Sequence, residues 1–311
     1  MPGWTVADIP SQNGRSVIVT GATGGLGYET ALALAQAGAN VILAGRNDAK
    51  GRAAVEKIHA VHPRATIAFE KLDLASLTSV TDFAKRFASA HSALDLLVNN
   101  AGVMAPPTRQ TTLDGFELQF GTNYLSHFAL TGLLLPLLRR GQQPRIVNLS
   151  SGASWTGAIQ FADLQWERSY KSWPAYSQSK LAMLMFALDL QRRSDAHGWG
   201  LLSIAAHPGY ARTDLIANGP GKPNLLTRLA RPLSQSAADG ALPTLFAAAA
   251  SKAKGGEYYG PAGLLELKGS PATARVPRRA RNLAVQGELW DVSERLTGVS
   301  FDTSAASRAT P

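Results

Sequence analysis

Short apolar runs alternate with segments of helical periodicity along most of the chain. The runs are apolar at nearly every position rather than at every second one, as in SVIVT (16–20) and LDLLV (94–98). Strands that are apolar on both faces are typical of a parallel sheet covered by helices on both sides. The pattern predicts strands over 16–20, 40–44, 66–69, 94–98, 145–149, 201–205 and 257–259, and helices over 30–37, 48–61, 74–90, 115–139, 175–193 and 237–250.

These elements predict an α/β protein with one doubly wound parallel sheet of about seven strands and helices on both faces. Ligands of such sheets bind at the carboxyl ends of the strands. Because no linker-like segment or internal repeat interrupts the pattern, we expect residues 1–311 to form a single domain.

The composition changes this picture little. With 45% hydrophobic and 17% charged residues, the chain is expected to be globular rather than disordered. The lack of cysteine excludes disulfides, thiolate metal sites and cysteine nucleophiles. Residues 1–14 do not resemble a signal peptide, and the longest apolar run (128–138) is about half of the roughly 20 residues that a membrane span needs. We therefore expect a cytoplasmic protein without a transmembrane segment.

The net charge of +9 has two interpretations: a surface that binds nucleic acid or anionic membranes, or a site that attracts phosphate groups. Basic residues are spread along the chain, apart from an arginine-rich stretch at 275–281, and no basic stripe is interleaved with aromatic residues. This distribution favours the phosphate site, and we expect no nucleic-acid partner.

A glycine-rich segment, TGATGGLG (20–27), lies between the first predicted strand and the first helix. Glycines there allow the backbone to approach a pyrophosphate, which binds the amides at the positive end of the helix. A glycine cluster alone is weak evidence, but its position at the start of a βα series predicts a dinucleotide site and a single-domain Rossmann fold. The expected contacts are Gly21, Thr23, Gly25, Leu26 and Gly27.

The second predicted strand is followed by Arg46. An acidic residue at this position would accept hydrogen bonds from the ribose hydroxyls of NAD, whereas a guanidinium pairs well with the 2′-phosphate of NADP. The alternative is a solvated arginine at the start of a helix. We interpret Arg46 as a cofactor contact and predict NADP(H), with NAD(H) as the less favoured cofactor.

Further motifs follow along the chain: Asp73-Leu74, NNAG (99–102), Asn123, Ser151, Tyr176-x-x-x-Lys180, and Pro208-Gly209 with Thr213. Each motif alone has low specificity. Together and in this order the motifs resemble the short-chain dehydrogenase/reductase family, over about residues 16–259. The 25 positions from Ser151 to Tyr176, with FADL (161–164) and AYSQSKLA (175–182), are similar to the retinol dehydrogenase-like branch.

The chemistry explains the pair Tyr176 and Lys180. Reducing a carbonyl needs a hydride on carbon and a proton on oxygen, and a tyrosine can supply the proton. A free tyrosine has a pKa near 10, which is too high for a base at neutral pH. A lysine four residues later lies on the same face of a helix, and its charge favours the phenolate. The alternative for the pair alone is an amphipathic surface.

The resemblance implies roles for other residues. Ser151 would hydrogen-bond the substrate oxygen, with Ser150 as the competitor, and Asn123 would hold a water in a proton relay with Lys180. Lys180 would also bind the nicotinamide ribose, and family members are homodimers or homotetramers. The implied cofactor contacts are Asp73, Leu74, Asn100, Ala101, Gly102, Tyr176, Lys180, Pro208, Gly209 and Thr213.

Two late segments bear on the substrate. Residues 210–237 carry glycines and prolines and are expected to form a lid, with an apolar lining of Leu225, Leu226 and Leu229. Residues 263–311 form a C-terminal extension with a helix over 280–295 and a disordered tail after Ser300. The lining favours a lipophilic carbonyl or alcohol as substrate. Aromatic residues near the site could line the pocket or pack in the core: Trp155, Phe161 and Trp173.

Three other interpretations are less favoured. Glu56, His59 and His62 recur on one predicted helix, but their spacing is not that of a zinc site, so no metal is expected. The residues around Ser151 do not match the G-x-S-x-G motif that surrounds the serine nucleophile of acyl-transfer enzymes. A catalytically silent NADP(H)-sensing regulator on the same fold remains the alternative function, although such proteins usually lose the tyrosine or the lysine.

Overall fold

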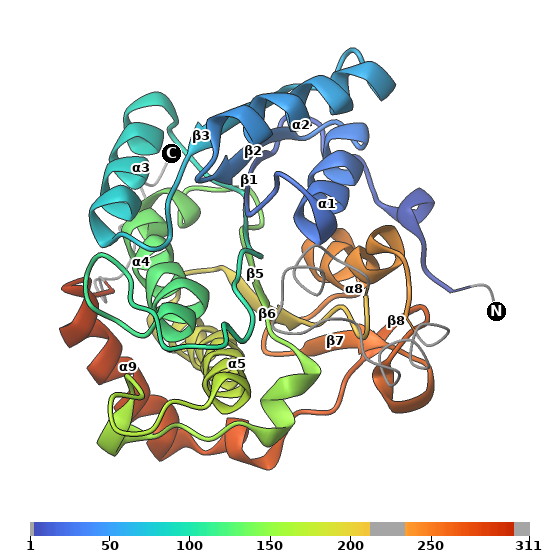
Figure 1. Ribbon diagram of the computed structural model, residues 1–311. Coiled ribbons are helices and arrows are strands. Elements are labelled where there is room, and N and C mark those ends of the chain that lie inside the picture. The colour runs from blue at the N-terminus through green and yellow to red at the C-terminus, as the bar shows by residue number, and fades with distance from the viewer. Residues whose placement is uncertain (1–2, 212–233, 302–311) are drawn as a thin grey trace.

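The structure is a computed structural model that describes residues 3–211 and 234–301. Among these residues, eight strands form one sheet in the order β3-β2-β1-β4-β5-β6-β7-β8 (Figure 1). All neighbouring strands are parallel except β7 and β8, so the doubly wound parallel sheet is confirmed. The strands are β1 (Ser16–Thr20), β2 (Asn40–Gly45), β3 (Ile67–Lys71), β4 (Leu96–Asn99), β5 (Arg145–Leu149), β6 (Leu202–Ala206), β7 (Tyr258–Pro261) and β8 (Pro271–Thr273).

Helices cover both faces of the sheet, as Figure 1 shows. One face packs against α1 (Gly25–Gln36), α2 (Asp48–Val61) and α8 (Ala237–Ala249). The other face packs against α3 (Leu77–Ala90), α4 (Ser126–Leu138), α5 (Ser172–His197) and α9 (Leu283–Thr297). None of the helices in the described ranges combines the length and the apolar character needed to cross a membrane.

Each strand is apolar at nearly every position because both of its faces are buried. Ile18 of β1 belongs to the core under α3, α4 and α5, whereas its neighbours Val17 and Val19 belong to the core under α1, α2 and α8. Side chains alternate between the two faces of a strand, which explains this division.

The sheet places a crevice where the chain reverses direction across it. β1 lies between β2 and β4, so the connection that follows β1 turns to one side and the connection that follows β4 turns to the other. Ligands of doubly wound sheets bind at this switch point, outside the carboxyl ends of the strands. Thr20 ends β1 and Asn99 ends β4, so the segments that follow them border this crevice.

The eighth strand was not predicted. β8 lies in the region that the sequence suggested was only an extension, and it pairs with β7 in antiparallel orientation, with Tyr259 opposite Thr273. It has three residues, PAT, and only partial burial, so it lacks the apolar run that identifies the other strands.

The helix expected over 115–139 begins later and is not α-helical throughout. Thr111 and Glu117 form an antiparallel bridge, and Gly115 between them has a φ of 85°. A π-helix then spans Phe120–Leu125 before α4 begins at Ser126. A π-helical turn is wider than an α-helical turn and occurs often at functional sites.

The C-terminal extension contributes to the core. The helix expected over 280–295 is α9, and the ring centroid of its Trp290 lies 4.6 Å from that of Phe301. Phe301, the first residue of the tail that the sequence suggested was disordered, is buried. Residues 302–311 and most of the expected lid, 212–233, lie outside the described residues, and with them Thr213 and the three leucines of the lid lining.

Candidate active site

The glycine loop lies against the segment that follows β4. A Cβ at Gly21, where φ is 65°, would lie 2.8 Å from the Cα of Ala101. A Cβ at Gly27 would lie 2.5 Å from the carbonyl oxygen of Gly21. Asn100 stabilises this contact, since its Nδ2 donates to the Thr20 carbonyl at 2.7 Å. The loop therefore has no room for side chains at these two positions, and it presents backbone at the start of α1.

The carboxyl end of β2 adjoins this loop. A Cβ at Gly45 would lie 3.1 Å from Cγ2 of Thr23, so the end of β2 and the glycine loop are in close contact. The next residue, Arg46, is exposed, and no hydrogen bond or ion pair within the described ranges engages its guanidinium. Asn47 then caps α2 by accepting the Lys50 N–H at 2.9 Å. Arg46 is thus free to pair with an anion beside the loop.

The loop after β3 is fixed by side-chain hydrogen bonds. The Asp73 N–H donates to Ser79 Oγ at 3.0 Å, and Asp73 Oδ1 accepts the Ala75 N–H at 2.9 Å. The Leu74 carbonyl accepts a hydrogen bond from Ser126 Oγ at 2.7 Å. Asp73 and Leu74 therefore hold a defined turn at the carboxyl edge of the sheet.

Tyr176 and Lys180 lie one turn apart near the start of α5, and both are buried. Lys180 Nζ lies 5.9 Å from the centroid of the Tyr176 ring and donates to the Leu149 carbonyl at 3.1 Å. The Ser151 side chain lies close enough to the Tyr176 hydroxyl to lower its pKa, and its Oγ accepts the Ala153 N–H at 3.2 Å. The neighbouring Ser150 instead donates to the Lys180 carbonyl at 2.8 Å. The first serine therefore anchors α5, and the second faces the tyrosine.

Burial changes the acidity of both groups. It raises the pKa of Tyr176 to about 12, although the nearby Ser151 side chain acts in the opposite direction. It lowers the pKa of Lys180 to about 8, because a buried ammonium loses its hydration. At neutral pH the tyrosine thus holds its proton and the lysine is charged. Strongly perturbed groups that lie together are typical of catalytic sites.

Asn123 connects three segments from the middle of the π-helix. Its Oδ1 accepts the Val103 N–H at 2.7 Å, and its Nδ2 donates to the Val103 carbonyl and to Ser179 Oγ, both at 2.9 Å. A Cβ at Gly102 would lie 3.1 Å from Asn123 Oδ1 and 3.5 Å from Lys180 Nζ. The end of the NNAG segment therefore lies directly against Asn123 and Lys180.

The segment after β6 is held by the connection between β7 and β8. Gly209 has a φ of 61°, and a Cβ there would lie 2.4 Å from the Leu267 carbonyl oxygen. The Pro208 carbonyl accepts a hydrogen bond from Gln235 Nε2 at 2.7 Å. His207 Nε2 lies 3.1 Å from Glu266 Oε2, and this contact lowers the pKa of the Glu266 carboxyl.

Sequence comparison identifies the family. A family model described as short chain dehydrogenase matches residues 15–221. The chain is a member of the short-chain dehydrogenase family. Mouse retinol dehydrogenase 12 is 39% identical to it over 291 residues, 93% of this chain and 88% of the relative. Polyprenol dehydrogenase from Danio rerio is 40% identical over 297 residues, which cover 94% and 89% of the two chains.

Solved structures agree with this assignment. An uncharacterised protein from Mycobacterium paratuberculosis matches the dehydrogenase with a TM-score of 0.81 at 41% identity, over 97% of this chain and all of the other. A short-chain dehydrogenase from Shigella flexneri, solved in complex with NADP, has a TM-score of 0.62 at 26% identity, over 81% and 97% of the two chains. The protein is therefore an oxidoreductase that acts on alcohol or carbonyl groups, in a family that uses nicotinamide cofactors.

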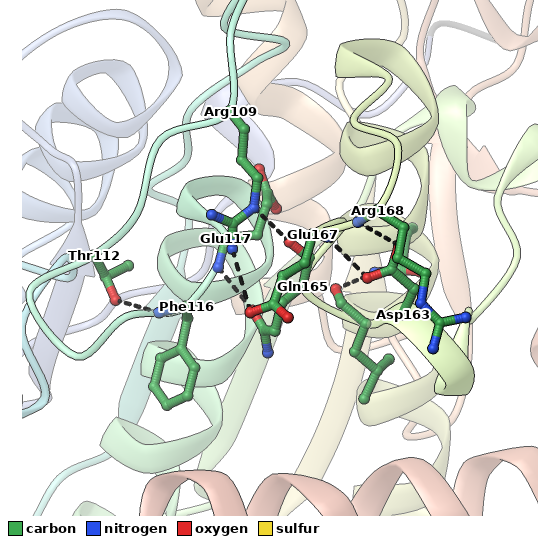
Figure 2. A network of polar contacts seen from close by, with 10 residues as sticks. Arg109, Thr112, Phe116, Glu117, Asp163, Gln165, Glu167 and Arg168 are labelled. Atoms are coloured by element: carbon green, nitrogen blue, oxygen red, sulfur yellow. Dashed lines mark hydrogen bonds and ion pairs between the residues drawn. The ribbon is translucent and has the colours of Figure 1, made fainter.

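The dehydrogenase also contains a polar network that the sequence did not predict. Figure 2 shows Arg109, whose Nε donates to the Gln165 carbonyl at 2.8 Å. Gln165 Oε1 accepts the Glu117 N–H at 2.7 Å, and the Asp163 carboxylate accepts the N–H of Glu167 at 2.8 Å. These contacts join the segment between Gly102 and the π-helix to the segment that leads into α5.

Glu117 of this network caps the π-helix of the dehydrogenase. It is fully buried, and its carboxylate accepts the N–H of Gln119 at 3.0 Å and of Phe120 at 2.7 Å. Burial raises the pKa of Glu117, while these hydrogen bonds act in the opposite direction. Glu117 lies in the first turn of the helix expected over 115–139, and an acidic residue in that turn is a helix-start signal that could have identified it from the sequence.

Proposed function

We propose that this chain is an NADP(H)-dependent oxidoreductase that transfers a hydride between the nicotinamide and the carbonyl or alcohol carbon of a lipophilic substrate. The observation that carries the proposal is the buried side chain of Tyr176, which lies beside Lys180 and near enough to Ser151 for that side chain to affect its pKa. In this role Tyr176 is the general acid during reduction and the general base during oxidation.

The residues at the switch point fit a dinucleotide. Gly21 and Gly27 leave the backbone at the start of α1 bare, and a pyrophosphate binds such amides. We assign the remaining contacts along the carboxyl edge of the sheet by resemblance to the family. They are Thr23, Gly25, Leu26, Asp73, Leu74, Asn100, Ala101, Gly102, Pro208, Gly209 and Thr213.

In the reducing direction, Tyr176 donates its hydroxyl proton to the substrate oxygen, and Ser151 donates a hydrogen bond to the same oxygen. The nicotinamide, when bound, supplies the hydride. Because the pKa of Tyr176 is raised to about 12, the proton remains available at neutral pH until the oxygen becomes basic. The charge of Lys180 stabilises the phenolate that Tyr176 becomes, and Asn123 holds the water through which a proton returns.

Arg46 supports NADP(H) as the cofactor. Its guanidinium is exposed beside Thr23 and Gly45, where the 2′-phosphate of NADP would need a cation. The Shigella flexneri relative that was solved with NADP is consistent with this choice.

Aromatic surface near Tyr176 supports a lipophilic substrate. The ring centroid of Trp173 lies 5.4 Å from that of Tyr176, and its side chain is half exposed. Trp155, on the 3₁₀ turn after Ser151, is also half exposed. The relatives named retinol dehydrogenase and polyprenol dehydrogenase suggest long apolar alcohols or the corresponding aldehydes.

The test is turnover of all-trans-retinal and of a small polar carbonyl, dihydroxyacetone, by the purified chain with NADPH and with NADH. We expect retinal to be reduced with NADPH. Tyr176→Phe should lower kcat by roughly 10²- to 10⁴-fold, with NADPH binding retained. Turnover of dihydroxyacetone alone would refute the lipophilic substrate, and an active Tyr176→Phe variant would refute the role of the tyrosine.

A further inference from the structure

His127 is a buried imidazole to which the proposed mechanism gives no role. It lies in the first turn of α4, two residues after the last residue of the π-helix, and its side chain has no exposed surface. Its ring nitrogens lie between the π-helix that carries Asn123 and the end of β1 that begins the glycine loop. A fully buried imidazole needs a partner for each ring nitrogen, and both partners are present here.

The first partner fixes the tautomer. His127 Nδ1 lies 2.9 Å from the backbone carbonyl oxygen of Asn123. A carbonyl oxygen can only accept, so Nδ1 carries the proton and donates it. The hydrogen bond satisfies a buried carbonyl within the π-helix, at the residue whose side chain fixes Val103 and Ser179.

The second partner connects the ring to the glycine loop. His127 Nε2 lies 2.9 Å from Thr20 Oγ1, which accepts the N–H groups of Asn100 and Ala101, each at 2.9 Å. Because these two bonds use both lone pairs of the hydroxyl, its proton is free to be donated. It is directed to His127 Nε2 rather than to the Val98 carbonyl, which is more distant at 3.3 Å.

The network requires a neutral ring. A proton on Nε2 would need an acceptor, and Thr20 Oγ1 has no lone pair left for it. Burial, together with the nearby charge of Lys180, lowers the pKa of His127 to about 4, although the hydrogen bond to the Asn123 carbonyl acts in the opposite direction. The imidazole is therefore neutral over the range in which most enzymes are assayed.

We propose that His127 is a positioning residue that connects the cofactor loop to the catalytic π-helix, through Thr20 on one side and the Asn123 carbonyl on the other. The proposal rests on the roles proposed above for Asn123 and Lys180. The two ends of the connection differ. Without the ring, the Thr20 hydroxyl can turn to the Val98 carbonyl, whereas the Asn123 carbonyl loses the hydrogen bond from the His127 side chain. The loss should therefore affect catalysis more than cofactor binding.

Two conservative variants separate the two ends. In His127→Asn the side-chain amide reaches about as far as Nδ1 and can still donate to the Asn123 carbonyl. In His127→Gln it reaches about as far as Nε2 and can pair only with Thr20. Thr131→Val is the matched control, because it removes one buried hydrogen bond from the same helix, between Thr131 Oγ1 and Asn99 Nδ2 at 3.1 Å.

Steady-state reduction of all-trans-retinal with NADPH, the Kd for NADPH and the melting temperature would be measured for each variant. We expect His127→Gln to lower kcat by roughly 10- to 100-fold, because a misplacement of about 1 Å has effects of this size. Its Kd for NADPH should stay within about threefold of wild type. His127→Asn should recover most of kcat, and Thr131→Val should lower the melting temperature without lowering kcat.

If His127→Asn and His127→Gln lowered kcat equally, and the loss followed the fall in melting temperature, the proposal would be overturned. His127 would then only contribute to packing. Wild-type kcat in His127→Gln would also overturn the proposal. A second measurement needs no turnover: ¹⁵N NMR of histidine-labelled protein, with the signal assigned by its absence in His127→Asn. We expect a ring protonated at Nδ1 and not at Nε2 between pH 6 and 9, and a proton on Nε2 would contradict the network. If wild type reduces no carbonyl, the proposed function fails, and this spectrum still decides the tautomer.

Discussion

The two faces of the sheet are built from different side chains. Under α1 and α8 the core is mostly alanine, valine and leucine, and a Cβ at Gly240 would lie 2.6 Å from Cβ of Ala211 and 2.9 Å from Cδ2 of Leu26. Under α3, α4, α5 and α9 the described part of the core contains ten buried aromatic side chains: Phe83, Phe87, Phe120, Tyr124, Phe128, Phe186, Trp199, Tyr258, Trp290 and Phe301.

This difference corresponds to two kinds of chemistry. On the α1 and α8 face, small residues let helices and loops approach closely, and the proposed dinucleotide site presents bare backbone. The proposed catalytic groups Asn123, Tyr176 and Lys180 all come from the elements of the aromatic face. Rigid apolar packing there removes water from the tyrosine and the lysine, and it shifts the pKa of each.

The strongest test of the comparison is a cavity on the aromatic face. The Phe128 ring lies 5.0 Å from both Trp290 and Phe301 and 5.3 Å from Phe186, measured between centroids. Phe128→Ala should lower the free energy of unfolding by roughly 3–5 kcal/mol in urea titrations. Phe246→Ala, which removes a partly exposed ring from α8, is the control and should cost less. A larger loss in the control would contradict the comparison.

Lys180→Met tests the cost of a buried charge on the same face. The shift of the Lys180 pKa from 10.5 to about 8 corresponds to a penalty on the order of 3 kcal/mol, partly offset by the bond to Leu149. The variant should therefore be more stable than wild type at pH 7, and inactive. Between pH 8 and 10.5 the unfolded lysine binds more protons than the folded one, so this group makes wild type more stable as pH rises.

The measurement is the melting temperature of both proteins from pH 7 to 10.5. The advantage of Lys180→Met should shrink across this window. Lys57→Met, at an exposed position of α2, should show no such trend. A constant difference between wild type and Lys180→Met would mean that the Lys180 charge is not destabilised by burial.

A smaller effect is expected on the alanine-rich face. Gly27→Ala would place a Cβ 2.5 Å from the Gly21 carbonyl oxygen, so the loop must shift. We expect a loss of roughly 1–3 kcal/mol in stability and a weaker Kd for NADPH. Gly287→Ala in α9 is the control, since a Cβ there meets open space and should stabilise the helix by up to about 1 kcal/mol. Unchanged NADPH binding in Gly27→Ala would refute the role of the loop.

The sequence predicted the strands wherever a strand is buried on both faces and therefore appears as a continuous apolar run. The strands β1 and β5 were predicted with their observed bounds, because both faces of each are buried. β8 could not be predicted, since its three residues are only partly buried. The π-helix could not be predicted either, because apolar periodicity does not distinguish a widened turn from an α-helical one.

In the candidate site too, the sequence predicted residue types and spacing but not the contacts that form only in the folded chain. Residue types and spacing predicted that Tyr176 and Lys180 share a face, and the structure adds that both are buried. Which serine faces the tyrosine depends on the hydrogen bonds of Ser150 and Ser151, and these cannot be read from adjacent identical residues. His127 has no sequence signal of its own, because its partners, Thr20 and the Asn123 carbonyl, meet it only in the folded chain.

The central claim, an NADP(H) site at the switch point, is tested most directly by titrating the protein with NADPH and NADH while following nicotinamide fluorescence. The proteins would be wild type, Arg46→Asp and the control Arg52→Asp, which makes the same charge change at an exposed position of α2. We predict that wild type binds NADPH more tightly than NADH, that Arg46→Asp loses this preference, and that Arg52→Asp keeps it. Equal or tighter NADH binding by wild type would contradict the claim.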